Sequence, residues 1–291
     1  MKYTIKHLRT EFGTDNKCLQ FVFENRYGKD YQCPRCGAKG KFYLIEDRKR
    51  FDCVCGFTVS PLAGTIFHKS STPLTLWFHT IFLFASSRNG VSAKELERQL
   101  GVTYKCAWRL AKQVRILFAQ ANNPLSGIVE ADETYVGGIR KGKRGRGAKN
   151  KTAVFGMVER KGAVKAEVVD HIRIKTIQPI IDSSVVKGTT LMTDEFNVYN
   201  RVKKSGYDHQ TIRHGIGEYV NGLIHSNSIE GFWSQLKRSI NGTHHSVSPK
   251  YLQLYVDEFA WRYSHRGQAL FPLMLATAVK PVSANYERTF S

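Results

Sequence analysis

The spacing of apolar residues changes along the chain and divides it into parts that predict different structures. In residues 92–116 apolar positions recur at helical spacing in two runs that Gly101 separates. Ser92, with Glu95 three residues later, is typical of a helix start, and Thr103 is suited to cap the second helix. The pattern therefore predicts two helices joined by a short turn.

Two helices joined by a short turn that contains glycine have the layout that places a second helix in the DNA major groove. In that interpretation the candidate DNA contacts stand at the start of the second helix and one turn later: Thr103, Tyr104, Lys105 and Arg109. A plain helical hairpin that serves only packing is the alternative. The preceding run at 74–87 is apolar on most sides and predicts a buried supporting helix.

From residue 125 onward, strand-like runs alternate with helical ones, an order that predicts an α/β domain with a central mixed sheet and flanking helices. The predicted elements are strands at 128–136, 152–160 and 163–170, a helix at 176–186, a strand at 189–194, a polar segment at 195–206 that is a candidate helix, a short strand at 209–214 and an amphipathic helix at 226–240.

Four of the six cysteines stand in two close pairs. Cys33 and Cys36 have CxxC spacing, Cys53 and Cys55 are one residue closer, and a glycine follows each pair. The sixteen residues between the pairs include two strand-like runs, FYLI and RFDC. Such pairs predict a tetrahedral zinc site with a structural role, because four thiolates leave no open coordination position. Four unrelated reduced cysteines are the alternative.

The charge of the chain points to a partner. Its 291 residues carry 44 Lys+Arg against 24 Asp+Glu, a formal net charge of +20. Such an excess favours a polyanion, because each neutralised phosphate releases condensed counterions. No run of 18 apolar residues indicates a membrane span, and residues 1–15 lack the apolar core of a signal peptide. We expect a cytoplasmic, nucleoid-associated protein with no membrane partner.

Three carboxylates of the α/β region lie at positions that a folded sheet can bring close together. Asp132 lies in the first predicted strand, Asp194 ends the fourth, and Glu230 lies in the first turn of the last helix. If the fold brings them together, their oxygens can hold two divalent metal ions for cutting and joining phosphodiesters. The chain would then be an enzyme that acts on DNA.

Each of these acids also has a plainer interpretation. Asp132 competes with Glu130 and Glu133 on the same predicted strand. Asp194 can merely cap the segment that follows it, and Glu230 can belong to a helix-capping box. Spacing alone does not choose among these interpretations.

Several stretches match one known family. They are CPRCG and CVCG at the cysteines, DETYVGG at 132–138, TDEFNVY at 193–199, and HSNSIEGFWSQLKRSINGTHHSVSPKYLQLYVDEFAWRYSHR at 225–266. On these residues the chain resembles the bacterial insertion-sequence transposases of the IS1595 (ISXO2-like) group, DDE transposases whose catalytic core has an RNase H-like fold. The resemblance covers nearly the whole chain in order, and its last stretch is highly specific.

The resemblance implies a site. Asp132 and Asp194 would be the first two metal ligands and Glu230 the third acid. Some family members carry Asn or His in place of that Glu, so Asn227 and His225 are candidates to assist. The implied catalytic cofactor is Mg²⁺, with Mn²⁺ as a substitute, beside structural Zn²⁺.

The implied function is that of a DNA transposase that binds insertion-sequence ends and catalyses metal-dependent cleavage and strand transfer. Its partners would be double-stranded DNA, as terminal inverted repeats and as target, and further copies of the chain in a synaptic homo-oligomer. A non-catalytic DNA-binding regulator and a nuclease that cuts without joining stay open as alternatives. The expected domains are a zinc ribbon at 18–62, a helix-turn-helix region at 70–122 and an RNase H-like catalytic domain at 125–291.

Two basic groups beside the expected site are candidate phosphate contacts. One is a glycine-containing loop after the first strand of the α/β region, for which a solvated loop without DNA contact is the alternative. The other follows Glu230 along its helix. The candidates are Arg140, Lys141, Lys143, Arg144 and Arg146 in the loop, and Lys237 and Arg238 on the helix.

Overall fold

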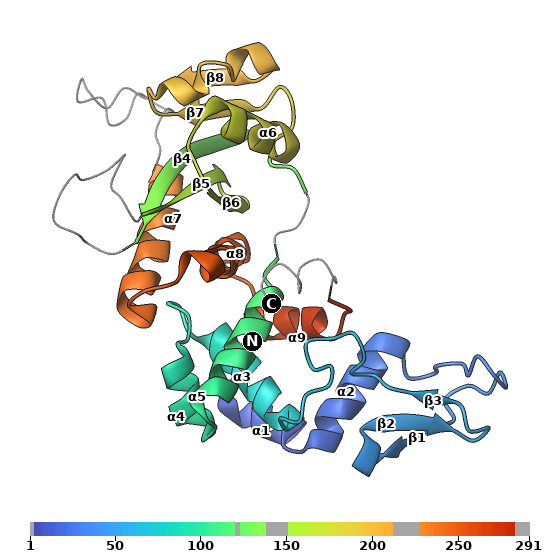
Figure 1. The fold of residues 1–291 in the computed structure, drawn as a ribbon. Helices are drawn as coiled ribbons and strands as arrows, with labels where there is room; N and C mark the ends of the chain where they lie inside the picture. The colour runs from blue at the N-terminus through green and yellow to red at the C-terminus, as the bar shows by residue number, and fades with distance from the viewer. Residues whose placement is uncertain (1–2, 120–122, 138–150, 212–226, 283–291) are drawn as a thin grey trace. The chain divides into compact units, whose positions relative to one another are not determined.

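The computed structural model describes residues 3–119, 123–137, 151–211 and 227–282 (Figure 1). It divides into two compact units. The first consists of two segments, the chain up to Leu117 and the chain from Gln268 onward, and the second runs from Phe118 to Gly267. The segment from Gln268 thus belongs to the same compact unit as the N-terminal part of the chain. The boundaries of the functional domains stay a prediction. No helix among the described residues is long and apolar enough to cross a membrane.

The first unit is mainly helical and is built around a buried aromatic helix. Its helices are α1 (Ile5–Phe12), α2 (Asp15–Tyr27), α3 (Leu74–Ser86), α4 (Ala93–Leu100), α5 (Tyr104–Ile116) and α9 (Leu270–Ala278). The side chains of Trp77, Phe78 and Phe84 on α3 are fully buried, which confirms the predicted supporting helix. Helix α9 packs on α3, and the rings of Phe271 and Phe82 lie 5.8 Å apart.

The predicted pair of helices at 92–116 is confirmed together with its caps. The Ser92 Oγ accepts a hydrogen bond from the Glu95 N–H at 3.1 Å, which begins α4. Gly101 ends α4 with φ 64, a left-handed conformation that favours glycine. The Thr103 Oγ1 accepts from the Cys106 N–H at 3.3 Å, which begins α5.

The cysteine region forms a small antiparallel sheet in the order β1-β2-β3. The predicted runs FYLI and RFDC are β1 (Phe42–Ile45) and β2 (Arg50–Cys53), joined by the turn η1 (Glu46–Arg48), and β3 is Thr58–Val59. The sheet is anchored to α2 by Phe51, whose buried ring stacks on Phe23 at 4.1 Å. A second ring of the sheet, Phe42, also contacts Phe23, at 5.7 Å, so aromatic contacts with α2 support this region together with the cysteine cluster.

The second unit contains a mixed sheet in the order β6-β5-β4-β7-β8. Strands β4, β5 and β6 pair antiparallel, whereas β7 runs parallel to β4 and β8 parallel to β7. This order and these directions are those of an RNase H-like core, which confirms the expected fold class. The strands are β4 (Ile128–Val136), β5 (Thr152–Glu159), β6 (Val164–Val169), β7 (Thr190–Thr193) and β8 (Asp208–Thr211).

Helices cover both faces of this sheet (Figure 1). On one face, α6 (Ile174–Ser184) buries Ile177 and Ile181 against Phe155. On the other, Phe232 of α7 and Phe259 of α8 pack against Val154. The elements of this second face are α7 (Asn227–Arg238), the π-helical turn η5 (Ser239–His244), the turn η6 (Pro249–Tyr251) and α8 (Leu252–Ser264).

The segment at 195–206 is not the helix that was considered. It forms two short 3-10 turns, η2 (Asn197–Tyr199) and η3 (Lys203–Ser205). The segment begins with a side-chain-closed turn, in which the Asp194 carboxylate accepts a hydrogen bond from the Phe196 N–H at 3.0 Å.

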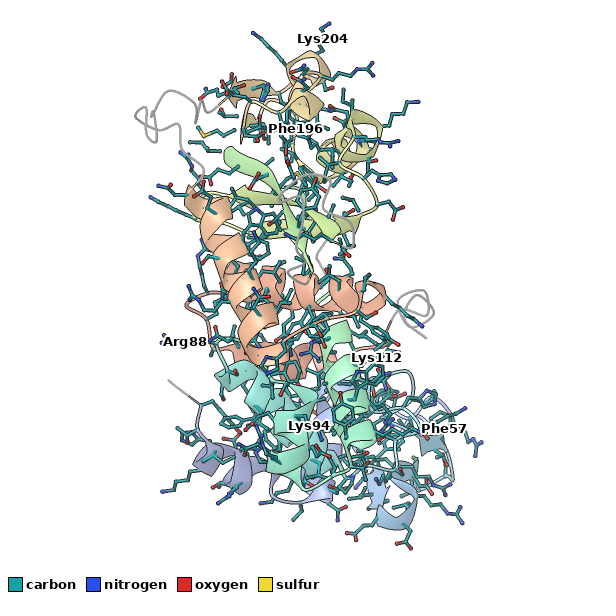
Figure 2. The ribbon with its side chains drawn as sticks, turned by 60° about the vertical axis from the view of Figure 1, so that its left-hand side comes forward. Phe57, Arg88, Lys94, Lys112, Phe196 and Lys204 are labelled. Carbon is teal, nitrogen blue, oxygen red and sulfur yellow. The ribbon has the colours of Figure 1, made fainter. Side chains whose placement is uncertain are left out.

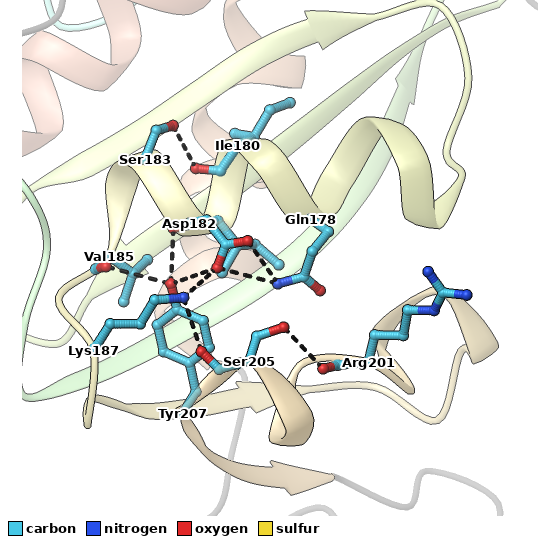
Figure 3. A network of polar contacts seen from close by, with 10 residues as sticks. Gln178, Ile180, Asp182, Ser183, Val185, Lys187, Arg201, Ser205 and Tyr207 are labelled. Carbon is cyan, nitrogen blue, oxygen red and sulfur yellow. Dashed lines mark hydrogen bonds and ion pairs between the residues drawn. The ribbon is translucent and has the colours of Figure 1, made fainter.

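A polar network ties the end of α6 to the segment that leads into β8 (Figure 3). The Asp182 carboxylate accepts from the Tyr207 hydroxyl at 3.1 Å and from the Lys187 ammonium at 2.5 Å. Lys187 also donates to the Ser205 carbonyl at 2.8 Å. These bonds hold β8 and β7 in place and thereby support the strand that leads to Asp194.

Candidate metal centres and DNA contacts

The sulfur atoms of Cys33, Cys36, Cys53 and Cys55 all lie within 4.8 Å of one another. Glycines that follow the pairs allow this: Gly37 (φ 72) donates its N–H to the Cys33 carbonyl, and Gly56 (φ 78) to the Cys53 carbonyl. The sequence prediction of a clustered four-cysteine site is confirmed. Among the residues that the structure describes, this is the one group of three or more metal-type ligands within that distance.

The geometry of the cluster fits zinc. The Cys33 and Cys55 sulfurs lie 3.6 Å apart and those of Cys36 and Cys53 3.7 Å apart. A tetrahedron with Zn–S bonds of about 2.3 Å has edges of about 3.8 Å, whereas a disulfide would require about 2.05 Å. Burial opposes ionisation of Cys33, but the backbone N–H groups of Cys36 and Arg35 hold the pKa of its thiol below the usual value, at about 6. Four cysteines with no open position fit a structural ion.

Asp132 lies in the middle of β4, and Asp194 directly follows the end of the neighbouring parallel strand β7. Strands β4 and β7 pair Glu130 with Met192, and the same register continued by two residues would set Asp132 opposite Asp194. Neighbouring strands are about 4.8 Å apart, so this register would bring the two carboxylates close together where β7 ends. Burial, followed by the charges of Glu133 and Asp194, raises the pKa of Asp132 to about 6. A crowded, partly desolvated pair of carboxylates is a donor set that suits a hard divalent cation.

Glu230 lies in the first turn of α7, as expected, and its side chain is exposed. Helix α7 packs on the sheet face that carries Asp132. In the described chain the three carboxylates are not drawn into a cluster as tight as that of the cysteines. The role of Glu230 as the third acid therefore stays a prediction. Asn227 begins α7 and is exposed, and His225 lies outside the described residues.

Trp233 is a residue beside the predicted site that the sequence did not single out. Its ring is buried, but its indole Nε1 donates to the Asp132 carboxylate at 3.0 Å. The ring lies directly over Gly156, the residue of β5 that pairs with Asp132. A Cβ at Gly156 would stand 2.5 Å from the indole, so only glycine leaves room for the ring here. The sequence offered one signal for this contact, a tryptophan three residues after Glu230. The carboxylate that it contacts, Asp132, lies 101 residues away in the sequence.

The other two acids of β4 have partners of their own. Glu133 accepts from the Tyr199 hydroxyl at 3.0 Å. Glu130 is fully buried and pairs with Arg160 at 2.7 Å. These contacts favour Asp132 as the metal ligand of β4, and that role stays a prediction.

The candidate DNA contacts of α5 divide into two groups. Thr103, Tyr104 and Lys105 have exposed side chains at the start of the helix, and Figure 2 shows Lys94 and Lys112 on the same helical pair. Arg109 instead donates to the Ser70 hydroxyl at 2.7 Å and lies over the Trp77 ring, so its guanidinium serves packing within the unit. DNA contact by these residues stays a prediction.

The basic candidates near the carboxylates are only partly described. Lys237 and Arg238 are exposed at the end of α7. Partial desolvation lowers the pKa of Lys237, while the charge of Asp132 acts in the opposite direction, so the ammonium lies within electrostatic range of that carboxylate. The loop candidates Arg140, Lys141, Lys143, Arg144 and Arg146 lie outside the described residues.

Two segments of the chain match known protein families. Residues 124–264 match the family described as ISXO2-like transposase domain, and residues 13–55 match the transposase zinc-ribbon domain. A relative from Halobacterium salinarum (strain ATCC 700922 / JCM 11081 / NRC-1), an uncharacterized protein in transposable element ISH50, is 26% identical over 294 residues, which cover 92% of this chain and 98% of the relative. A chain in the crystal structure of a pre-cleavage Mos1 transpososome is similar at 11% identity and a TM-score of 0.23, over 70% of this chain and 79% of that chain.

The four-cysteine ribbon and the α/β unit are therefore both parts found in DNA transposases. The chain belongs to the IS1595 family of ISXO2-like transposases.

Proposed function

We propose that this transposase nicks DNA at the ends of its insertion sequence and joins the freed 3′ ends to target DNA, with Mg²⁺ as the catalytic cofactor. The observation that supports the proposal is the parallel pairing of β4 with β7 through Glu130 and Met192, a register that would set Asp132 opposite Asp194. Helix α7 covers the face of the sheet to which Asp132 points, and Glu230 lies in its first turn. Burial of Asp132 beside the charges of Glu133 and Asp194 disfavours its ionised form, and a bound cation would relieve this cost.

Asp132, Asp194 and Glu230 would hold the metal through carboxylate oxygens, and Mn²⁺ would substitute for Mg²⁺. When bound, such ions supply activation of the attacking hydroxyl and neutralisation of the charge on the leaving oxygen. The protein's own contribution is positioning. Trp233 orients the Asp132 carboxylate through its indole N–H, and Lys237 places a positive charge where a DNA phosphate would approach.

The remaining parts would bind DNA. We propose that the exposed start of α5, with Thr103, Tyr104 and Lys105, reads the terminal inverted repeat and that Lys237 and Arg238 contact phosphates. The zinc ribbon would serve as a rigid basic module beside the helices. Because two ends must be joined to one target, more than one copy of the chain would assemble in the active complex.

The sharpest test substitutes the second and third acids. Asp194→Asn and Glu230→Gln should each abolish Mg²⁺-dependent nicking of a terminal-repeat duplex while binding of that duplex survives. Glu167→Gln, which changes an exposed carboxylate on β6, is the matched control and should nick normally. Unchanged nicking in either site variant would overturn the metal-ligand assignment.

A second assay separates the proposed function from its two alternatives. A duplex with a preprocessed 3′ end should be joined to a target plasmid by the wild-type chain. A nuclease would nick the unprocessed duplex but would not join the processed one. A non-catalytic regulator would bind both duplexes and change neither.

A further inference from the structure

Glu130 holds a buried carboxylate for which catalysis has no direct use. Its side chain is fully excluded from solvent, in the middle of β4. One carboxylate oxygen accepts from the Arg160 Nε at 2.7 Å. The other accepts from two backbone N–H groups, those of Ser228 at 2.9 Å and Ile229 at 3.0 Å. These are the second and third residues of α7.

Glu130 therefore caps a helix that is almost one hundred residues away in the sequence. The first N–H groups of a helix have no partner within the helix, and a carboxylate at that end also meets the positive end of the helix dipole. Caps usually come from the residue just before the helix. Here the acceptor belongs to a strand, so the bond fixes the start of α7 relative to the sheet.

Arg160 holds Glu130 in this position from the opposite side. Its backbone N–H donates to the Ile128 carbonyl at 2.9 Å, and its guanidinium lies 3.1 Å from the Met192 sulfur on β7. The arginine thus contacts the strand that carries Asp132 and the strand that leads to Asp194. Buried ion pairs add little stability compared with apolar residues of similar volume, so this pair is better understood through the geometry that it imposes.

Helix α7 is attached to β4 at a second point. One turn beyond the Glu130 cap, Trp233 donates to Asp132. Residues 130 and 132 point to the same face of β4 because strand side chains alternate. Glu230 lies between the two attachments, one residue after Ile229 and three before Trp233. The two hydrogen bonds therefore restrict sliding and rotation of α7 at the turn that carries Glu230.

We propose that Glu130, held by Arg160, is a positioning residue that sets where α7 begins and thereby places Glu230 against Asp132 and Asp194. The proposal rests on the proposed function, since it gives Glu230 a role at the carboxylate site. It adds a contact at which the third acid is aligned, and it predicts that loss of the cap impairs nicking without removing any metal ligand.

The first test compares two buried ion pairs of the same unit. Glu130→Gln weakens the cap, whereas Glu258→Gln disrupts the buried Glu258–Arg262 pair within α8, away from the start of α7. Glu130→Gln should lower the nicking rate about 100-fold, the scale expected from a misplacement of about 1 Å, with duplex binding unchanged. Amide exchange in the first turn of α7 should become about 5- to 30-fold faster. Glu258→Gln should change neither quantity beyond its effect on overall unfolding.

A second variant keeps the proposal testable if Glu130→Gln folds poorly. The double substitution Glu130→Leu with Arg160→Met replaces the ion pair by apolar side chains, a change that often preserves stability while removing the cap. It should fold, bind the duplex and still nick poorly. Wild-type nicking by this variant, or equal losses in the Glu130 and Glu258 variants, would overturn the positioning role.

A metal-binding readout distinguishes failure of this proposal from failure of the proposed function. Mn²⁺ alone is titrated into the wild-type chain, the Glu130 variants and Glu230→Gln, and bound Mn²⁺ is counted by electron paramagnetic resonance. Weaker Mn²⁺ binding in the Glu130 variants and in Glu230→Gln supports positioning. If Glu230→Gln binds Mn²⁺ and nicks like wild type, the proposed site itself is wrong. If only the Glu130 variants behave like wild type, positioning alone is wrong.

Discussion

The two candidate metal centres of this protein are built in opposite ways. The cysteine cluster takes its ligands from two short turns that lie within 23 residues, from Cys33 to Cys55, and its sulfurs already stand at distances that suit a tetrahedral ion. The proposed carboxylate site would take its ligands from a strand, the residue after a second strand and a helix, spread over 99 residues from Asp132 to Glu230, and these acids do not form a cluster as tight as that of the cysteines. One centre is local and closed, and the other is assembled by the fold.

This difference matches what each centre has to do. A structural ion needs a closed shell, which short turns with glycines can form on their own. A catalytic ion needs open positions for DNA, so its ligands cannot enclose it. An open site gains little rigidity from its ligands and depends on contacts behind them, here the Trp233 indole at Asp132 and the Glu130 carboxylate at the start of α7.

The largest effect is expected at the cysteine cluster, where loss of the ion should remove local structure. Removal of zinc with a chelator should unfold the β1–β2–β3 ribbon, because zinc binding and folding of such small modules are coupled by about 10–16 kcal/mol. The α/β unit should keep its structure. Zinc content and amide exchange measured together check this, with Cys106→Ala as a control that should retain one zinc. A purified chain without zinc near one equivalent would refute the assignment.

The next effect is expected where Trp233 crosses the sheet. Gly156→Val places a side chain where the indole lies, and overpacking of this kind costs about 1–3 kcal/mol. We expect lower stability in urea and loss of nicking, because α7 must move away from β4. Gly231→Ala on the open side of α7 is the matched control, and it should be neutral or stabilising. Equal behaviour of the two variants would show that the indole contact is not important.

A smaller change removes only the hydrogen bond. Trp233→Phe keeps most of the ring but loses the N–H that reaches Asp132. Hydrogen bonds to charged groups contribute about 1.5–3 kcal/mol, so we expect nicking to fall about tenfold or more at saturating DNA with little change in duplex binding. Trp261→Phe, on α8, should leave the rate unaltered. A wild-type rate in Trp233→Phe would reduce Trp233 to a core residue.

The smallest effect is expected on the helical pair. Lys105→Ala should weaken duplex binding a few-fold and lower the salt dependence by about one counterion, because the side chain is exposed at the start of α5. Arg109→Gln should instead lower the stability of the first unit, since the guanidinium bonds to Ser70 and Thr72. Binding measured over a salt series, beside thermal unfolding, checks both. A loss of binding by Arg109→Gln at full stability would restore its DNA role.

Local elements were predictable to within a few residues. Strands β1, β2 and β4 have the predicted bounds, and Ser92, Gly101 and Thr103 act as the predicted helix signals. Such signals depend on neighbours within one turn or one strand. The polar segment at 195–206, a candidate helix by its pattern, instead forms two short 3-10 turns.

Long-range relations could not be derived from spacing. Nothing in the sequence specifies that β4 pairs with β7 in the register that sets Glu130 beside Met192. Glu130 was one of three neighbouring acids until its bonds to α7 distinguished it. The hydrogen bond from Arg109 to Ser70, which gives that predicted DNA contact a packing role as well, was not visible in the sequence.

The sequence by itself determined the zinc ribbon, the helical pair, the order of strands and helices, and the acids to consider. These follow from local periodicity, from glycine and capping chemistry, and from cysteine spacing. Only the tertiary structure decided which strands are neighbours, which acid of β4 holds α7, and that Trp233 contacts Asp132. The physical reason is that strand register and helix docking depend on contacts between residues about one hundred positions apart. Such contacts form only when the chain folds.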